Sequence, residues 1–130
     1  MFNSIKHDRL RPESGVPIKE LQSQHIRNME VLANRQVLLE RMPKGSVCAE
    51  VGVDRGDFSA KILEIVKPKK LYLIDLWGDS RYDDRVMNEV KLKLQSEIES
   101  GQVEILRGYS HEVLSELGDG ILDWVYIDTN

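Results

Sequence analysis

The chain has 130 residues, of which 41% are hydrophobic, so it is long enough to form one domain with a core of its own. Its formal net charge is −4 and its basic residues are scattered along the sequence, which argues against nucleic acid as a partner. Its apolar runs are too short to span a bilayer and its polar start differs from a signal peptide, so we expect a cytoplasmic protein with no membrane partner.

The N-terminal part of the chain separates into a polar stretch and an amphipathic one. Residues 1–17 are polar and lack periodicity, which predicts an arm in front of a domain over residues 18–130. From Ile18 to Met42 apolar residues recur near helical spacing, and Pro43 ends the segment. We therefore predict one helix here, which serves in packing or dimerisation or, alternatively, as a substrate lid.

A short apolar run and two glycines follow. Residues 46–53 predict a strand, and a turn that contains Gly52 and Gly56 leads into an amphipathic helix that ends before Pro68. A glycine at the end of a strand lets the backbone approach a ligand closely, and a second one lets the next helix begin close to the sheet. Asp57 is suited to cap that helix.

The next strand carries an acid near its end. The segment from Leu71 to Leu76 is apolar on both sides of the pleat, as expected for a central parallel strand that helices cover on both faces. A carboxylate at the position of Asp75 accepts hydrogen bonds from ribose hydroxyls in nucleotide-binding folds. The sequence therefore predicts an adenosine-containing ligand.

The rest of the chain continues the alternation of helices and strands. We predict a helix over 83–100, a strand over 103–107, a short helix that follows the turn 108–110 and ends at Gly118, and a strand over 121–127. This order is typical of an α/β fold, a Rossmann-like, doubly wound parallel sheet. The fourth strand is then expected beside the first, at an edge of the sheet.

The chain stops two residues after Asp128, before a helix that could cover the fourth strand. We therefore expect the N-terminal part of a longer domain, truncated after the fourth strand. A short protein that hides this edge by dimerisation is the alternative, and the oligomeric state stays open.

From Ser46 to Asn130 the chain resembles the class I S-adenosylmethionine-dependent methyltransferases. Glu50, Gly52 and Gly56 match the first motif of that superfamily, and Asp75 matches its second-strand acid. The runs AEVGVDRGDFS, LIDLW and DWVYID resemble a bacterial branch of small-molecule and sugar O-methyltransferases. The resemblance implies S-adenosylmethionine as cofactor and a small molecule or sugar as acceptor. That branch usually continues with histidine and acid residues that this chain lacks, so the catalytic residues are unknown.

The resemblance also implies roles for single residues at the first two strands. The backbone around Gly52 and Gly56 would hold the methionine part of the cofactor. Glu50 would support this loop or the ammonium group, or else be a buried strand acid. Asp75 would bind the ribose hydroxyls, or else be a turn carboxylate.

Further site residues follow the second, third and fourth strands. Leu76 and Trp77 lie where the adenine ring would be, although Trp77 is equally suited to the core. Ser110 matches an adenine-side polar position, or else caps the short helix. Asp128 would contact the ammonium group, act as a general base or be one ligand of a metal, but a hard cation needs several oxygen ligands, so no metal site is predicted.

Other reactive residue types receive ordinary structural roles. Cys48, the single cysteine, lies in an apolar run and is expected to be buried packing. His111 is expected to be an exposed residue in the first turn of a helix, and Arg55 a solvated charge.

An NAD-dependent dehydrogenase is the alternative enzyme class, because Asp75 lies about 20 residues beyond the glycines. Its fingerprint requires a glycine at Asp54, where a carboxylate would repel pyrophosphate. A sulfonium cofactor has no phosphate, so acids around it are favourable. A non-catalytic remnant that serves as an interaction module is a third reading.

Overall fold

The computed structural model of the chain describes residues 20–129. It divides after Val31 into two compact units. The described part of the first, residues 20–31, contains one short helix, α1 (Ser23–Ile26), whose N-terminal end is closed by a capping box between Gln22 and His25. The predicted arm over residues 1–17 lies outside the described residues, and its boundary stays a prediction.

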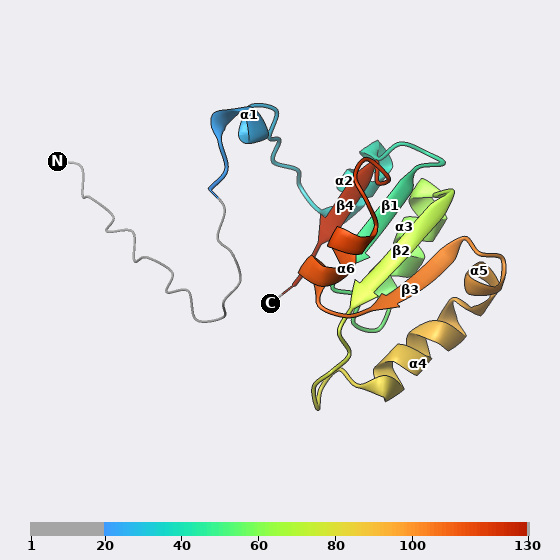
Figure 1. The fold of residues 1–130 in the computed structure, drawn as a ribbon. Helices are drawn as coiled ribbons and strands as arrows, with labels where there is room; N and C mark the ends of the chain where they lie inside the picture. Colours follow the sequence, from blue (N-terminus) through green and yellow to red (C-terminus); the bar gives the residue numbers. More distant parts are fainter. Residues whose placement is uncertain (1–19, 130) are drawn as a thin grey trace. The chain divides into compact units, whose positions relative to one another are not determined.

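The second unit is built on a parallel sheet of four strands (Figure 1). The strands are β1 (Val47–Val51), β2 (Lys70–Asp75), β3 (Val103–Arg107) and β4 (Trp124–Ile127). Their order is β3-β2-β1-β4, which confirms the predicted α/β fold and the place of the fourth strand beside the first. Because all pairs are parallel, the carboxyl ends of β1, β2 and β4 meet at one edge of the sheet.

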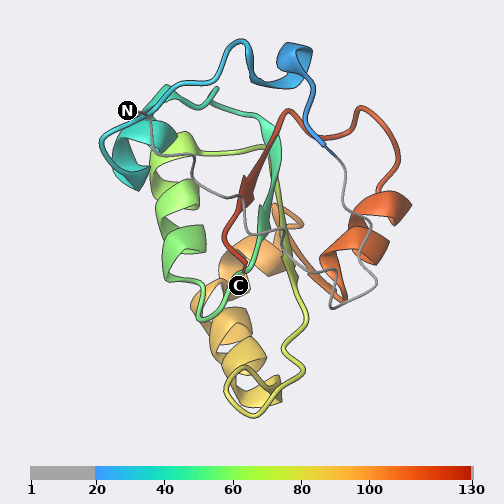
Figure 2. The same ribbon diagram turned by 90° about the vertical axis from the view of Figure 1, so that its left-hand side faces the viewer.

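Helices cover both faces of this sheet (Figure 2). They are α2 (Arg35–Arg41), α3 (Asp57–Val66), α4 (Asp84–Lys93), α5 (Gln95–Glu99) and α6 (Ser110–Glu116). Helices α3 and α4 lie on one side of the sheet and α6 lies on the other. Strands β1 and β2 are therefore enclosed from both sides, which explains why their sequences are almost continuously apolar.

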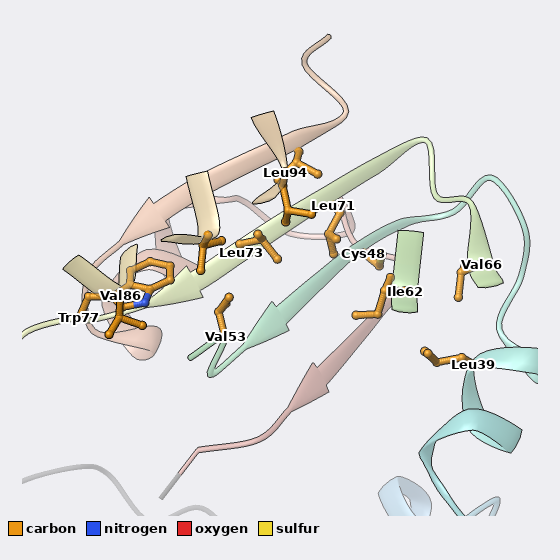
Figure 3. Close-up of a cluster of buried hydrophobic side chains, with 12 residues drawn as sticks. Leu39, Cys48, Val53, Ile62, Val66, Leu71, Leu73, Trp77, Val86 and Leu94 are labelled. Carbon is orange, nitrogen blue, oxygen red and sulfur yellow. The ribbon is translucent and has the colours of Figure 1, made fainter. Parts of the chain in front are cut away.

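The main core lies between the sheet and the helices α2, α3 and α4 (Figure 3). Its fully buried members include Leu39, Cys48, Ile62, Val66, Leu71, Leu73, Trp77, Val86 and Val90. A second, smaller cluster of Ala49, Val51 and Ile74 lies on the opposite face, with apolar side chains of α6 packed against it. The two clusters fix both faces of β1, the strand that leads into the glycine turn.

The predicted helix from Ile18 to Met42 is wrong over most of its length. Only α1 and α2 are helical in the described part of this segment, and residues 29–34 between them include extended and bent backbone. Of the apolar side chains that suggested one helix, Leu21 and Met29 are each 69% exposed. A helix gains most of its stability from tertiary packing, and here Leu39 alone is buried.

Two further predicted elements are shorter than expected. The helix predicted over residues 83–100 is interrupted at Leu94, where the backbone leaves helical geometry between α4 and α5. The fourth strand begins at Trp124 rather than at residue 121. Before it, the backbone N–H of Asp123 donates to the carbonyl of Val47 at 2.8 Å, and the carboxylate of Asp123 accepts from the backbone N–H of Val47 at 2.8 Å. A side chain thus takes the place of one of the two backbone partners there.

Within residues 20–129, the structure contains no helix whose length and apolar character would suffice to traverse a bilayer.

Candidate functional site

Two adjoining cavities lie at the carboxyl edge of the sheet. The first has a volume of about 310 Å³ and is lined by Gly52, Asp54, Asp75, Asp79, Tyr82, Asp128 and Thr129. The second, of about 240 Å³, is lined by Val51, Gly52, Ile74, Asp75, Leu76, Gly108, Tyr109, Ser110 and Thr129. Because they share three lining residues, the two cavities form one elongated site across the ends of β1, β2 and β4.

A larger cavity of about 600 Å³ lies elsewhere, beside β3 and the helices α4 and α5. Its lining includes Leu92, Ile98 and Val103 but none of the predicted site residues. The carboxyl edge is therefore the better candidate site, since ligands of open α/β sheets bind there.

A glycine is needed at position 52 because the backbone of Asp128 lies directly beside it. It has a φ of +90°, and a Cβ atom at this position would lie 2.1 Å from the carbonyl oxygen of Asp128. The backbone N–H of Asp128 in turn donates to the carbonyl of Val51 at 2.8 Å. The glycine thus lets the loop after β1 pass directly beside the end of β4, and its close approach to a ligand stays a prediction.

Gly56 begins α3. It is the N-cap residue in a left-handed conformation with a φ of +76°, and an added Cβ would lie 3.3 Å from Val90 of α4. The predicted cap at Asp57 is wrong, because Asp57 is the first helical residue and its carboxylate pairs with Lys93 at 2.5 Å. That ion pair lowers the pKa of Asp57.

Asp75 holds the glycine turn in place. Its Oδ2 accepts hydrogen bonds from the backbone N–H groups of Val53 at 2.7 Å and Asp54 at 3.0 Å, and its Oδ1 accepts from Trp77 at 3.3 Å. The turn-carboxylate role is therefore present in the structure. A carboxylate has about four acceptor positions and three are used here, so Asp75 keeps capacity for one further donor in the cavity.

Glu50 lies beneath the site rather than in its wall. Its side chain is 1% exposed and accepts a hydrogen bond from the hydroxyl of Ser59 at 2.5 Å. Burial raises the pKa of Glu50 to about 7, and the nearby carboxylates of Asp128 and Asp75 add to the rise. Glu50 is therefore a buried strand acid, the second of the two predicted roles, and its partner is the hydroxyl of Ser59 in α3.

Asp128 lies at the end of β4 and faces a cation that no sequence pattern predicted. Its Oδ2 is 3.1 Å from the Nη1 of Arg35, the first residue of α2. The two residues are 93 positions apart, and both side chains are more than half exposed. No local pattern links them, so sequence analysis missed Arg35.

The residues predicted around the adenine ring divide between the cavity and the core. Leu76 is 38% exposed and lines the second cavity together with Ser110 and Tyr109. Ser110 is not the helix cap, since Tyr109 holds the N-cap position of α6. Trp77 is 1% exposed and its Nε1 donates to the carbonyl of Asp54 at 3.1 Å, so it belongs to the core.

The ordinary roles predicted for three other residues are confirmed. Cys48 is buried, and burial raises the pKa of its thiol to about 12, so it is not a thiolate at neutral pH. His111 is exposed on α6. Arg55 forms a surface ion pair with Glu89 at 2.7 Å.

The first cavity has a strongly acidic wall. Asp54, Asp75, Asp79 and Asp128 contribute four carboxylates, and among the described residues that line it none is basic. Sequence analysis missed Asp79 and Tyr82, which lie in the loop after β2 and line this cavity. Within that loop the carboxylate of Asp79 accepts a hydrogen bond from the backbone N–H of Tyr82 at 2.8 Å. Across residues 20–129, His, Cys, Asp and Glu side chains form no group of three that could hold a metal ion.

Comparison with known proteins supports the fold. Precorrin-6y C5,15-methyltransferase from Geobacter metallireducens is 14% identical with a TM-score of 0.53, over 71% of this chain and 44% of that one. TrmK from M. capricolum, solved in complex with S-adenosyl-homocysteine, is 17% identical with a TM-score of 0.53, over 77% of this chain and 42% of that one. The fold is thus Rossmann-like, as predicted.

This chain spans less than half the length of either solved protein. No model of a protein family and no curated protein matches its sequence.

Proposed function

We propose that the protein is a methyltransferase that binds S-adenosylmethionine and methylates a hydroxyl group of a small molecule or sugar. The observation that carries this proposal is the acidic cavity around Gly52, with its four aspartates. The glycine turn, the acid at the end of β2 and the likeness to a methyltransferase and to a protein solved with S-adenosyl-homocysteine support it.

The charge of the cavity suits a cationic ligand. S-adenosylmethionine carries a sulfonium and an ammonium group and no phosphate. Two opposite charges 4 Å apart attract by about 4 kcal/mol at the effective dielectric constant of a protein surface. The pyrophosphate of NAD would meet the carboxylate of Asp54 in the glycine turn and be repelled, so the dehydrogenase alternative is disfavoured.

The second cavity suits an adenosine group. Asp75 lines both cavities and can accept a hydrogen bond from a ribose hydroxyl at the one acceptor position it has left. Leu76 and Tyr109 offer apolar surface for a purine ring, and Ser110 offers a polar partner at its edge.

When bound, the cofactor supplies a methyl group that is already activated, so the protein has to place the acceptor in line with it. The ends of β1 and β4 would orient the methionine part through the backbone around Gly52. Of the roles predicted for Asp128, we favour contact with the ammonium group. The carboxylate of Asp128 lines the acidic cavity, and an ammonium group fits a carboxylate.

A small acceptor fits the charge of the molecule better than a polyanion does. The net charge is −4 and the cavity wall is acidic, whereas nucleic acids are bound through clusters of Lys and Arg. The motif resemblance to sugar and small-molecule O-methyltransferases supports the same acceptor class.

Calorimetric titration of the protein with S-adenosylhomocysteine and with NAD tests the cofactor. We expect binding of S-adenosylhomocysteine and no measurable binding of NAD. Binding of NAD without a response to S-adenosylhomocysteine would overturn the proposal. Binding of the cofactor without turnover of any hydroxylated acceptor would favour the interaction module instead.

A further inference from the structure

The ion pair between Arg35 and Asp128 stands at the border of the acidic cavity. Asp128 lines the cavity, and Arg35 approaches it from α2, on the side where α3 begins. Both side chains are more than half exposed, so the pair is open to solvent and to a ligand. An exposed pair of this kind contributes little stability, and separating its partners therefore costs little.

The guanidinium of Arg35 is held in position by aromatic rings. Its Cζ lies 5.0 Å from the centre of the Phe58 ring, which itself packs against Tyr126 with 4.3 Å between ring centres. The neighbouring Tyr126 and Asp128 raise the pKa of Arg35, and an arginine side chain is in any case not deprotonated in proteins. The cation is thus placed next to Asp128 by α3 and β4 and not by the ion pair alone.

An α-amino acid group needs one anion and one cation at a short distance. Its ammonium fits a carboxylate, and its carboxylate fits a guanidinium, which can donate two parallel hydrogen bonds. The four carboxylates of the cavity wall would repel the second of these groups. A ligand with such a group therefore requires a basic residue at the end of the cavity where Asp128 lies.

We propose that Arg35 binds the carboxylate of the methionine part of the cofactor while Asp128 binds its ammonium group. The Arg35–Asp128 pair would open and each partner would take the matching half of the zwitterion. This inference rests on the proposed function and adds to it a recognition residue from outside the glycine turn.

Other basic side chains near the site are engaged elsewhere. Arg55 pairs with Glu89, and Lys93 binds Asp57 and the carbonyl of Arg55. Arg107 binds the carbonyls of Leu76 and Trp77 and the carboxylate of Asp84.

Arg81 is the matched control. It stacks over the ring of Tyr82 at 5.2 Å, in the loop after β2, beside the same cavity but on the side of Asp79 rather than Asp128.

The test compares S-adenosylmethionine with its decarboxylated form, which keeps the sulfonium and the ammonium but lacks the carboxylate. Calorimetric titration measures both ligands against the wild type, Arg35→Met, Arg35→Lys and Arg81→Met. We expect Arg35→Met to weaken binding of S-adenosylmethionine by about tenfold to a hundredfold and to leave the decarboxylated ligand unaffected. Arg35→Lys should recover part of the loss, and Arg81→Met should behave as the wild type.

Equal losses for both ligands in Arg35→Met, or no loss for either, would overturn the inference and leave the proposed function standing. The same holds if Arg81→Met, and not Arg35→Met, removes the preference for the carboxylate. A wild type that binds neither ligand would overturn the proposed function and the inference together. Because Arg35 is exposed, circular dichroism of Arg35→Met is expected to match that of the wild type.

Discussion

At the scale of the residue, Glu50 is the side chain whose environment departs most from that of a free carboxyl. It lies in β1 between Leu73 of β2 and Tyr126 of β4, and its carboxyl accepts a hydrogen bond from the hydroxyl of Ser59. Burial disfavours its charged form, and the carboxylates above it disfavour that form further. The folded protein therefore holds a proton on Glu50 at pH values where an exposed glutamate has lost it.

Glu50→Gln should remove a pH dependence of stability. The pKa of Glu50 rises from 4.5 to about 7 on folding, so the folded state binds the proton more tightly than the unfolded state. The stability of the wild type relative to this variant is then highest below the unfolded pKa and falls as the pH rises through the folded pKa. The loss approaches about 3 kcal/mol, at roughly 1.4 kcal/mol for each pKa unit.

Urea unfolding of both proteins at roughly pH 5 and pH 8 measures this difference. Glu64→Gln, at an exposed position of α3, is the control and should follow the wild type. Parallel pH profiles for the wild type and Glu50→Gln would show that the buried carboxyl titrates like an ordinary one.

Asp75 should contribute to both binding and folding, and two substitutions separate these roles. Asp75→Asn keeps an oxygen for the N–H groups of Val53 and Asp54 but loses the charge. We expect it to weaken binding of S-adenosylhomocysteine by about 1.5–3 kcal/mol, the range for hydrogen bonds to charged groups. Asp75→Ala should also lower the free energy of unfolding by about 1–3 kcal/mol, because it leaves those N–H groups without their acceptor.

Calorimetry and urea unfolding of the two Asp75 variants give both quantities. Asp79→Asn, in the wall of the same cavity, controls for the loss of one negative charge. An affinity of Asp75→Asn equal to that of the wild type would mean that Asp75 serves the glycine turn alone.

At the scale of the element, α2 shows how a short helix with few buried residues is held. It has seven residues, of which Leu39 is buried, and its first turn is capped by Asn34, whose Oδ1 accepts the N–H of Val37 at 3.0 Å. The same cap fixes the helix start at Arg35, the residue that reaches Asp128. The cap at Asn34 thus helps to set the position from which Arg35 reaches Asp128.

Asn34→Ala should destabilise the protein by about 1 kcal/mol through the loss of this cap. Asn34→Asp keeps a cap acceptor and is expected to retain the stability of the wild type. Urea unfolding distinguishes the two. Equal stability of Asn34→Ala and the wild type would indicate that the packing of Leu39 alone holds α2 on the core.

At the scale of the whole molecule, the sheet has an apolar edge at β4. This strand is last in the sheet order, and its residues Val125 and Ile127 are 38% and 67% exposed. Unpaired strand edges with apolar side chains favour pairing between copies of a chain. The exposed residues of β4 are therefore expected to take part in self-association.

Expressed alone, the chain should form assemblies larger than a monomer, and Ile127→Lys should disperse them, since a charge on an edge strand opposes pairing. Size-exclusion chromatography with light scattering measures the mass of both forms. Leu92→Lys is the control, because Leu92 is 75% exposed beside the other edge of the sheet. A monomeric wild type, or dispersal by Leu92→Lys instead, would contradict the role of β4.

The fold and part of the site followed from the sequence because they depend on local patterns. Apolar runs placed the four strands, with boundaries a few residues off. The topology of doubly wound sheets placed the fourth strand beside the first, as the order β3-β2-β1-β4 has it. In a parallel sheet the carboxyl ends of the strands share one edge, so Gly52, Asp75 and Asp128 were predicted to lie together, and they line one cavity.

Contacts between distant parts of the chain decided the rest. The predicted helix from Ile18 to Met42 is not continuous. Apolar side chains at helical spacing stabilise a helix only where they are buried by tertiary packing, and Met29 is 69% exposed. Trp77 and Glu50 are both buried. The sequence left their environments open because the burial of a side chain depends on its neighbours in space. The pairing of Arg35 with Asp128 joins residues 93 positions apart, a distance over which no periodicity or motif carries information, so only the tertiary structure could place that cation at the site.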